Sequence, residues 1–199
     1  MRFHAKYAGL MGGLVFTVIL GLACPPAARA DGGGGGGTSA PDPSKCGAGE
    51  YFSDRSGKCE KLRAGALSDQ DLAQYAYLLA KARRYDEAIA TLDLLKNPNT
   101  AVALNYRGYT TRQMGKLDEG IGYYLRSVKL DPHYALVREY LGEAYVLKGE
   151  MANANAQLAA IRRICGTSCA AYEHLAEAIS DGPNACGSRY AAKRCASGG

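Results

Sequence analysis

The sequence predicts an all-α fold in which three helix-turn-helix units are stacked in order and one further helix covers the C-terminal end. The first observation is a repeat, because similar residues recur at spacings of 32 and then 34 residues across about 69–165. The second is the apolar pattern inside the units, which has the period of a helix with one buried face. The third is composition, since 47% hydrophobic and 22% charged residues suit a globular core and exclude a wholly disordered chain.

Five positions of each unit carry the repeat. Small residues occupy two of these positions, and Gly108 with Gly120, like Gly142 with Ala154, would let two paired helices approach closely. The five sets are Ala76, Gly108 and Gly142; Leu79, Thr111 and Tyr145; Tyr85, Leu117 and Met151; Ala88, Gly120 and Ala154; and Leu92, Tyr124 and Leu158.

Residues with capping chemistry place the helix ends and predict seven helices, two in each unit and one more. The seventh is expected over about 168–180, where an amphipathic helix would cover the exposed apolar end of a repeat stack. The expected starts are Ser68 (with Asp71), Thr100 and Pro132, and the expected stops are Gly149 and Gly166.

The N-terminal thirty residues are typical of a secretory signal. Arg2, His4 and Lys6 precede an uncharged apolar stretch over 8–23, and small residues flank the expected cleavage after Ala30. The stretch is shorter than the ~20 apolar residues that a permanent span needs. We therefore expect a periplasmic or secreted mature chain that does not span a membrane.

A lipid anchor is the alternative destination. Leu22-Ala23-Cys24 loosely resembles a lipoprotein cleavage box, although Gly21 stands where that box prefers leucine. In that case the exported chain would be attached to a membrane through Cys24.

The chain divides into parts by composition. Six consecutive glycines and a Thr/Ser/Pro-rich stretch cannot bury a core, whereas a turn-forming Asp-Arg-Ser-Gly lies between two cysteines farther along. The expected parts are a signal peptide at 1–30, a glycine-rich flexible linker at 31–45, a small cysteine-closed hairpin or loop at 46–62, a helical repeat domain with its capping helix at 63–182, and a cysteine-containing tail at 183–199.

Seven cysteines become six when Cys24 leaves with the signal, and an even number in an oxidising compartment favours disulfides. Six cysteines allow 15 pairings, of which we prefer the local one; Cys165 or Cys169 bonded to the tail is the rival. The preferred pairs are Cys46 with Cys59, Cys165 with Cys169, and Cys186 with Cys195.

A metal or redox site at Cys165 and Cys169, with His174 as a third ligand, is the sharper alternative, because thiolate and imidazole suit copper or zinc. Three residues separate the cysteines, however, and not the two of a thioredoxin-like or zinc motif. A disulfide that ties the last helix to the stack is therefore preferred, and no metal or other cofactor is expected.

Charge and motifs exclude other classes of function. Loss of the signal removes three basic residues and no acidic one, which leaves 21 basic against 19 acidic residues without a concentrated basic stripe. Nucleic-acid binding is therefore not expected. The sequence has no nucleophile elbow, phosphate loop or zinc-binding helix motif, so an enzyme is not expected either.

Several stretches resemble the tetratricopeptide repeat family. The stretch 141–145 (Leu-Gly-Glu-Ala-Tyr) is similar to the first-helix signature of that repeat, and 84–88 (Arg-Tyr-Asp-Glu-Ala) and 115–120 (Gly-Lys-Leu-Asp-Glu-Gly) are similar to its inter-helix turn. Asp131-Pro132 is similar to the turn between units. The resemblance, to small exported bacterial members of the family, implies a right-handed superhelical stack with a C-terminal capping helix.

The first helices depart from the family pattern. Leu72, Leu104 and Arg138 stand where a bulky aromatic is expected, and Arg107 stands where an aliphatic residue is preferred. These positions bear on how the helices pack.

The resemblance also implies a groove, lined by the first helix of each unit, that binds a partner protein or an extended peptide. Tyrosine, asparagine and arginine suit such recognition; alternatively, the tyrosines are partly buried supports and the arginine is a solvated charge. The expected partner-binding residues are Tyr77, Asn105, Tyr109, Arg112, Glu139 and Glu143, within a wider set that adds Gln70, Ala73, Ala80, Val102, Leu136 and Val146.

The sequence therefore predicts an exported, non-catalytic scaffold or adaptor. The competing functions are a thiol-redox or metal-binding envelope protein that uses the C-terminal cysteines, and a purely structural envelope protein. Because about three units are the minimum for a stable stack, a homodimer formed through an uncovered face is compatible with the sequence.

Overall fold

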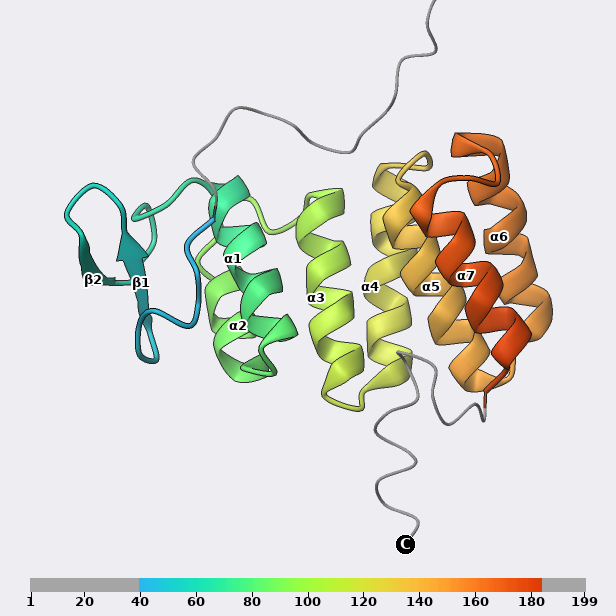
Figure 1. The fold of residues 1–199 in the computed structure, drawn as a ribbon, viewed down its shortest axis with the longest axis horizontal. Coiled ribbons are helices and arrows are strands. Elements are labelled where there is room, and N and C mark those ends of the chain that lie inside the picture. Colours follow the sequence, from blue (N-terminus) through green and yellow to red (C-terminus); the bar gives the residue numbers. More distant parts are fainter. Residues whose placement is uncertain (1–39, 184–199) are drawn as a thin grey trace, which may run out of the picture. The chain divides into compact units, whose positions relative to one another are not determined.

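A computed structural model describes residues 40–183; the expected signal peptide, Cys24 and the Cys186–Cys195 pair lie outside the described residues. Within this part a two-stranded hairpin precedes seven helices, which confirms the prediction of a mostly helical fold (Figure 1). The elements are β1 (Glu50–Ser53), β2 (Lys58–Lys61), α1 (Asp69–Lys81), α2 (Tyr85–Leu92), α3 (Ala101–Gln113), α4 (Leu117–Leu130), α5 (Ala135–Lys148), α6 (Met151–Cys165) and α7 (Ala170–Asp181).

The hairpin is antiparallel, with Phe52 opposite Cys59. Cys46 and Cys59 form the expected disulfide, with their Cα atoms 5.7 Å apart. The hairpin rests on α1, because the Tyr75 hydroxyl donates to the Glu50 carbonyl at 2.8 Å. Tyr51 of β1 also packs with Tyr75 and Leu79, so the hairpin contacts α1 through side chains.

Four of the five predicted helix ends are confirmed, at Ser68, Thr100, Gly149 and Gly166. The Ser68 and Thr100 hydroxyls accept hydrogen bonds from the backbone amides of Asp71 and Ala103, each at 3.1 Å, and so start α1 and α3. Gly149 ends α5 with φ of 77°, a left-handed conformation that favours glycine.

The start of α5 differs from the prediction. Pro132 does not open the helix but lies in a turn before it, where the Asp131 side chain accepts the His133 amide at 2.9 Å and the Asp131 carbonyl accepts the Tyr134 amide at 3.3 Å. The helix begins only at Ala135 because this local turn satisfies the preceding amides. The last helix likewise begins at Ala170, two residues after the predicted start.

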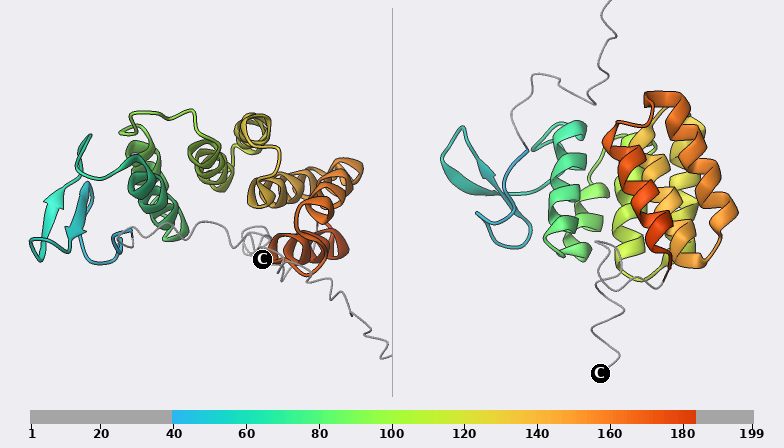
Figure 2. Two further views of the ribbon diagram at one scale, coloured as in Figure 1. Left: turned by 90° about the horizontal axis from the view of Figure 1, so that it is seen from above. Right: turned by 45° about the vertical axis from the view of Figure 1, so that its right-hand side comes forward.

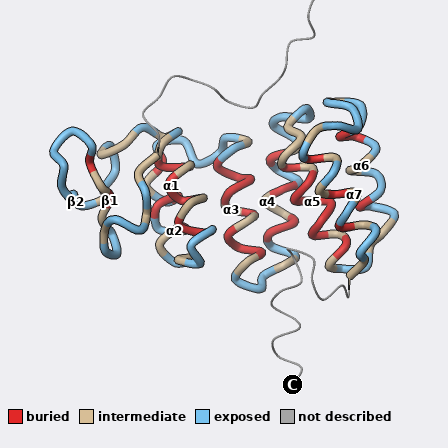
Figure 3. The backbone as a smooth tube through the Cα atoms, in the orientation of Figure 1, coloured by how far each residue is buried: buried red, intermediate tan, exposed pale blue. Residues whose placement is uncertain are grey.

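The helices contact one another in a regular order. We call α1 with α2 unit one, α3 with α4 unit two, and α5 with α6 unit three, and the two helices of each unit pack together. The first helices also touch in sequence, α1 against α3 and α3 against α5, and α7 packs against both α5 and α6 (Figure 2). Figure 3 shows that the buried residues lie where these helices face one another.

Glycines permit two of the closest approaches. A Cβ atom on Gly108 would lie 2.7 Å from the Tyr124 ring and 3.0 Å from the Gly120 carbonyl oxygen, so α3 and α4 meet as predicted. Gly142 acts differently from the prediction, because a Cβ there would meet Leu175 of α7 at 2.5 Å and no atom of α6 is as near. Gly142 therefore makes room for the terminal helix.

The terminal helix covers the end of the stack as expected. Leu175 is fully buried, and Ala171 and Ala178 pack with it against Ile161 of α6. None of the helices between residues 40 and 183 has the length and apolar character needed to cross a membrane.

Candidate functional site

The six expected partner-binding residues lie on α3, α5 and α1, but only two of them reach the surface. Tyr77 and Tyr109 are half-buried. The prediction that the other four face an open groove is wrong, because their exposed fractions are too small for contact with a partner. These fractions are 0% for Asn105, 6% for Arg112, 3% for Glu139 and 1% for Glu143.

Arg112 and Glu143 form a buried ion pair between α3 and α5. The Arg112 Nη2 atom lies 3.0 Å from the Glu143 Oε2 atom, and both side chains are at most 3% exposed. The guanidinium also lies within 5.9 Å of the ring centres of Tyr109, Tyr124 and Tyr140. The alternative interpretation of Arg112 as a solvated charge is therefore wrong as well.

The surroundings keep Arg112 charged. Burial alone would lower its pKa, but Tyr124 and Glu143 beside it raise the pKa above the usual value for arginine. Within the described residues the Nε and Nη1 atoms of Arg112 form no hydrogen bond, so contact with the tyrosine rings takes the place of further acceptors.

Glu139 and Asn105 connect neighbouring units. The Glu139 Oε1 atom lies 2.9 Å from the His174 Nδ1 atom on α7, and the Asn105 amide nitrogen donates to the Tyr134 hydroxyl at 3.2 Å. Both polar groups are buried because the next unit or α7 packs over them. They hold the stack together and do not form an open surface.

Four tyrosines form a continuous aromatic cluster on the first helices. Tyr77 of α1 stacks on Tyr106 with ring centres 4.7 Å apart and meets Tyr109 edge-on at 5.4 Å, and Tyr109 lies 5.3 Å from Tyr140 of α5. The hydroxyls of Tyr77 and Tyr140 are hydrogen-bonded at 3.0 Å. The exposed Lys81 ammonium lies 6.0 Å and 5.8 Å from the Tyr77 and Tyr109 ring centres. We call Tyr77, Tyr109 and Lys81 the tyrosine face; the buried Tyr140 lies beneath it.

Burial suppresses ionisation within and beneath the tyrosine face. It raises the pKa of Tyr109 to about 12 and also raises the pKa of Tyr140, with its hydrogen bond to Tyr77 as a second cause. Both phenols therefore stay neutral even in mildly alkaline solution, and the hydroxyl of the half-buried Tyr109 can both donate and accept.

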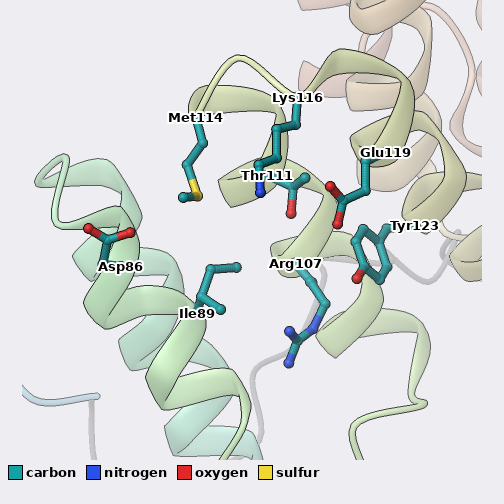
Figure 4. A pocket seen from close by; sticks show the side chains of 8 residues that line it. All are labelled: Asp86, Ile89, Arg107, Thr111, Met114, Lys116, Glu119 and Tyr123. Atoms are coloured by element: carbon teal, nitrogen blue, oxygen red, sulfur yellow. The ribbon is translucent and has the colours of Figure 1, made fainter.

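The described part also has a hollow on the other side of α3, which we call the α2/α4 furrow (Figure 4). Among the described residues, α2 and α4 each pack against α3 but not against each other. Two adjoining cavities of about 180 Å³ and 270 Å³ lie between them, and Arg107 and Tyr123 line both. Figure 4 shows the Arg107 side chain between Ile89 of α2 and Tyr123 of α4.

No site was predicted in the furrow, although the sequence marks it through the unusual residue at Arg107. The repeat spacing makes Arg107 equivalent to Tyr75 and Leu141, which are both only 1% exposed, whereas the Arg107 side chain is 17% exposed. Arg107 is therefore a long charged residue at a position that is apolar and buried in the other two units. The departure from the family pattern at Arg107 thus marks the hollow.

In the described part, the two cysteines nearest the C-terminus are bonded to each other. Cys165 at the end of α6 and Cys169 before α7 form a disulfide with Cα atoms 6.0 Å apart, which confirms the local pairing over a bond to the tail. While that bond is closed, neither sulfur is available as a thiolate ligand. Residues 40–183 contain no group of three or more His, Cys, Asp or Glu side chains placed to hold a metal ion.

The chain was compared with protein families and with curated proteins. No protein-family model matches the chain, and no curated protein matches it either.

Proposed function

We propose that this chain is an exported, non-catalytic adaptor of the tetratricopeptide type that binds a partner protein or an extended peptide through the tyrosine face. The repeat spacing, the packing of first helix on first helix and the terminal helix on α5 support this type. The right-handed superhelical stack is part of the proposal. The two disulfides support export, because such bonds persist in oxidising compartments. The signal over 1–30 is part of the proposal.

The observation that carries the proposal is the half-buried pair Tyr77 and Tyr109 beneath the exposed Lys81. Each ring is already held by neighbouring rings, and the Tyr77 hydroxyl is fixed by Tyr140 at 3.0 Å. Rigid aromatic side chains lose little conformational entropy on binding, which is why tyrosine is common in binding surfaces. The tyrosine face therefore suits recognition better than an equally exposed flexible surface.

The buried ion pair supports this face from below. Arg112 lies 5.8 Å from both the Tyr109 and Tyr140 ring centres, and Glu143 fixes Arg112 from the neighbouring helix. The buried pair Arg112 and Glu143 therefore helps to position the accessible Tyr109. The partner segment would place apolar or aromatic side chains on the rings and an acidic side chain near Lys81.

The test is selection of peptides from a random displayed library on the immobilised chain, followed by affinity measurement on the variants. Lys81→Glu and Tyr109→Ala should each weaken the selected peptides by about tenfold or more, because each removes a contact of about 1.4 kcal/mol or more. Lys129→Glu, the same charge change at an exposed site on α4, is the matched control and should bind normally. Equal affinities for all variants would exclude the tyrosine face as the binding surface.

A further inference from the structure

The α2/α4 furrow has the chemistry of a second binding site. Its 270 Å³ cavity is lined by Arg107, Arg126 and Asp93 as charged residues, which leaves a net charge of +1 there. Its 180 Å³ cavity adds the apolar side chains of Ile89 and Met114. One end therefore favours a negative group, and the other accepts an apolar side chain.

Tyr123 holds the two arginines at the basic end. The guanidinium carbons of Arg107 and Arg126 lie 6.0 Å and 5.7 Å from the Tyr123 ring centre. Arg107 also donates through Nη2 to Asp93 at 2.6 Å, and Arg126 donates through Nη2 to Asn99 at 2.8 Å. These contacts orient both guanidiniums and leave most of their N–H donors unused. An arginine has five N–H donors, and among the described residues each of these two bonds only through Nη2.

The ion pair at this end is open to exchange. The Asp93 side chain is 60% exposed, whereas the Arg107 side chain is 17% exposed. The Asp93 side of the pair is therefore open to solvent, where ion pairs are weak, and an incoming carboxylate can take the place of Asp93 on the guanidinium. The contrast with Arg112 is clear, because that guanidinium is closed to solvent by the helices around it.

We propose that the α2/α4 furrow binds an extended peptide segment of a partner protein, with a carboxylate on Arg107 and Arg126 and an apolar side chain between Ile89 and Met114. Both arginines line the same cavity, which favours a carboxylate there, since guanidinium–carboxylate hydrogen bonds are charge-assisted and directional. In the other cavity Asp86 and Glu119 balance Arg107 and Lys116, so a polyanion such as nucleic acid is not favoured along the whole furrow. The site is separate from the tyrosine face.

The probe is the blocked peptide acetyl-Ala-Ile-Ala-Asp-Ala-amide, titrated into the full ¹⁵N-labelled chain and followed by amide and arginine Nε chemical shifts. We expect shifts at Arg107, Tyr123 and Arg126. The same peptide with Asn in place of Asp should bind about tenfold more weakly, because it lacks the charge-assisted contact. A peptide with the same Ile but a free C-terminal carboxylate and no Asp tests whether the carboxylate comes from a side chain or a chain end.

Variants separate this site from the proposed tyrosine face. Arg126→Gln should weaken the Asp peptide by about tenfold, whereas Lys129→Gln, an equal change of charge on the same helix outside the furrow, and Lys81→Glu should leave its affinity unchanged. Equal binding of the Asp and Asn peptides, an unchanged affinity of Arg126→Gln, or shifts confined to Tyr77 and Tyr109 would each overturn the proposal. No shifts at 10 mM peptide, a concentration far above the roughly 1 mM dissociation constant of a weak site, would overturn it too.

Discussion

Glu143→Gln removes the carboxylate that neutralises Arg112 while keeping a side chain of the same shape. Because the Arg112 and Glu143 side chains are 3% and 1% exposed, water cannot replace the lost charge. Breaking a buried pair on one side typically costs about 3–5 kcal/mol. We take the lower end, about 3 kcal/mol, since glutamine can still accept a hydrogen bond from the guanidinium.

The assay is urea unfolding followed by the helical circular dichroism signal at neutral pH. With a slope of about 2 kcal/mol per molar urea, a loss of about 3 kcal/mol lowers the midpoint by about 1.5 M. The slope itself should not change, because the surface buried in the folded state is the same.

A double variant distinguishes the charge from the packing. Arg112→Met with Glu143→Leu removes both charges and fills the space, and a buried pair replaced by apolar residues is often neutral or stabilising. The double variant should therefore be more stable than Glu143→Gln. A midpoint loss under about 0.5 M for Glu143→Gln, or a double variant no more stable than the single one, would refute the reasoning. Charge reversal at Arg112 should prevent folding, because it would bury two carboxylates together.

Three other perturbations give independent checks. Burial raises the pKa of Tyr109 to about 12, so between about pH 10, the value for an exposed tyrosine, and pH 12 the folded chain holds more protons than the unfolded chain. The contribution of Tyr109 to the free energy of unfolding is present in full below about pH 10 and is lost as the pH rises across that window. A urea midpoint that is as high at about pH 11.5 as at about pH 9 would contradict this. Gly108→Ala should destabilise by about 1–3 kcal/mol despite a better helix propensity, since its Cβ meets the Tyr124 ring at 2.7 Å; Gly122→Ala, with no atom within 4 Å of the new Cβ, is the control and should not destabilise in thermal unfolding. Cys165→Ser with Cys169→Ser should cost about 2 kcal/mol by the loop-entropy argument and leave peptide affinity unchanged; bound copper or zinc in the wild type, measured by elemental analysis, would instead favour the metal alternative.

The helix ends were predictable from the sequence where one residue decides them. A serine or threonine that accepts an amide two or three residues ahead, as at Ser68 and Thr100, does so whatever the tertiary structure. At Pro132 two local preferences compete, and the side chain of Asp131 forms a turn that delays the helix. Single residues are therefore a reliable guide only where no neighbour offers the backbone another partner.

The buried state of the predicted site was not predictable in the same way. Arg112 and Glu143 are far apart in the sequence and meet because α3 and α5 lie side by side. Repeat spacing makes Glu143 equivalent to Tyr77 and Tyr109, a position at which the side chain was expected to face the groove. Only the contact across units shows that this carboxylate serves the arginine of the preceding unit.

The helix that packs against Gly142 was also not predictable from the sequence. A small residue in a first helix predicts that something approaches closely, but it does not say which helix. In unit two the glycine receives Tyr124 of its own partner helix, whereas in unit three it receives Leu175 of α7. The difference arises from the terminal helix, whose docking depends on residues outside the repeat.

Unit two brings the two proposed surfaces together on one helix. Arg107 and Tyr109 are two residues apart on α3, and at about 100° per residue their side chains leave the helix on opposite sides. Arg107 therefore lines the α2/α4 furrow while Tyr109 belongs to the tyrosine face. Between them, Gly108 draws α4 against α3, and the long Arg107 side chain with Asp93 occupies the side of α3 toward α2. Because the two surfaces share a rigid helix but no side chain, occupation of one does not obstruct the other. This is the arrangement that an adaptor joining two partners requires.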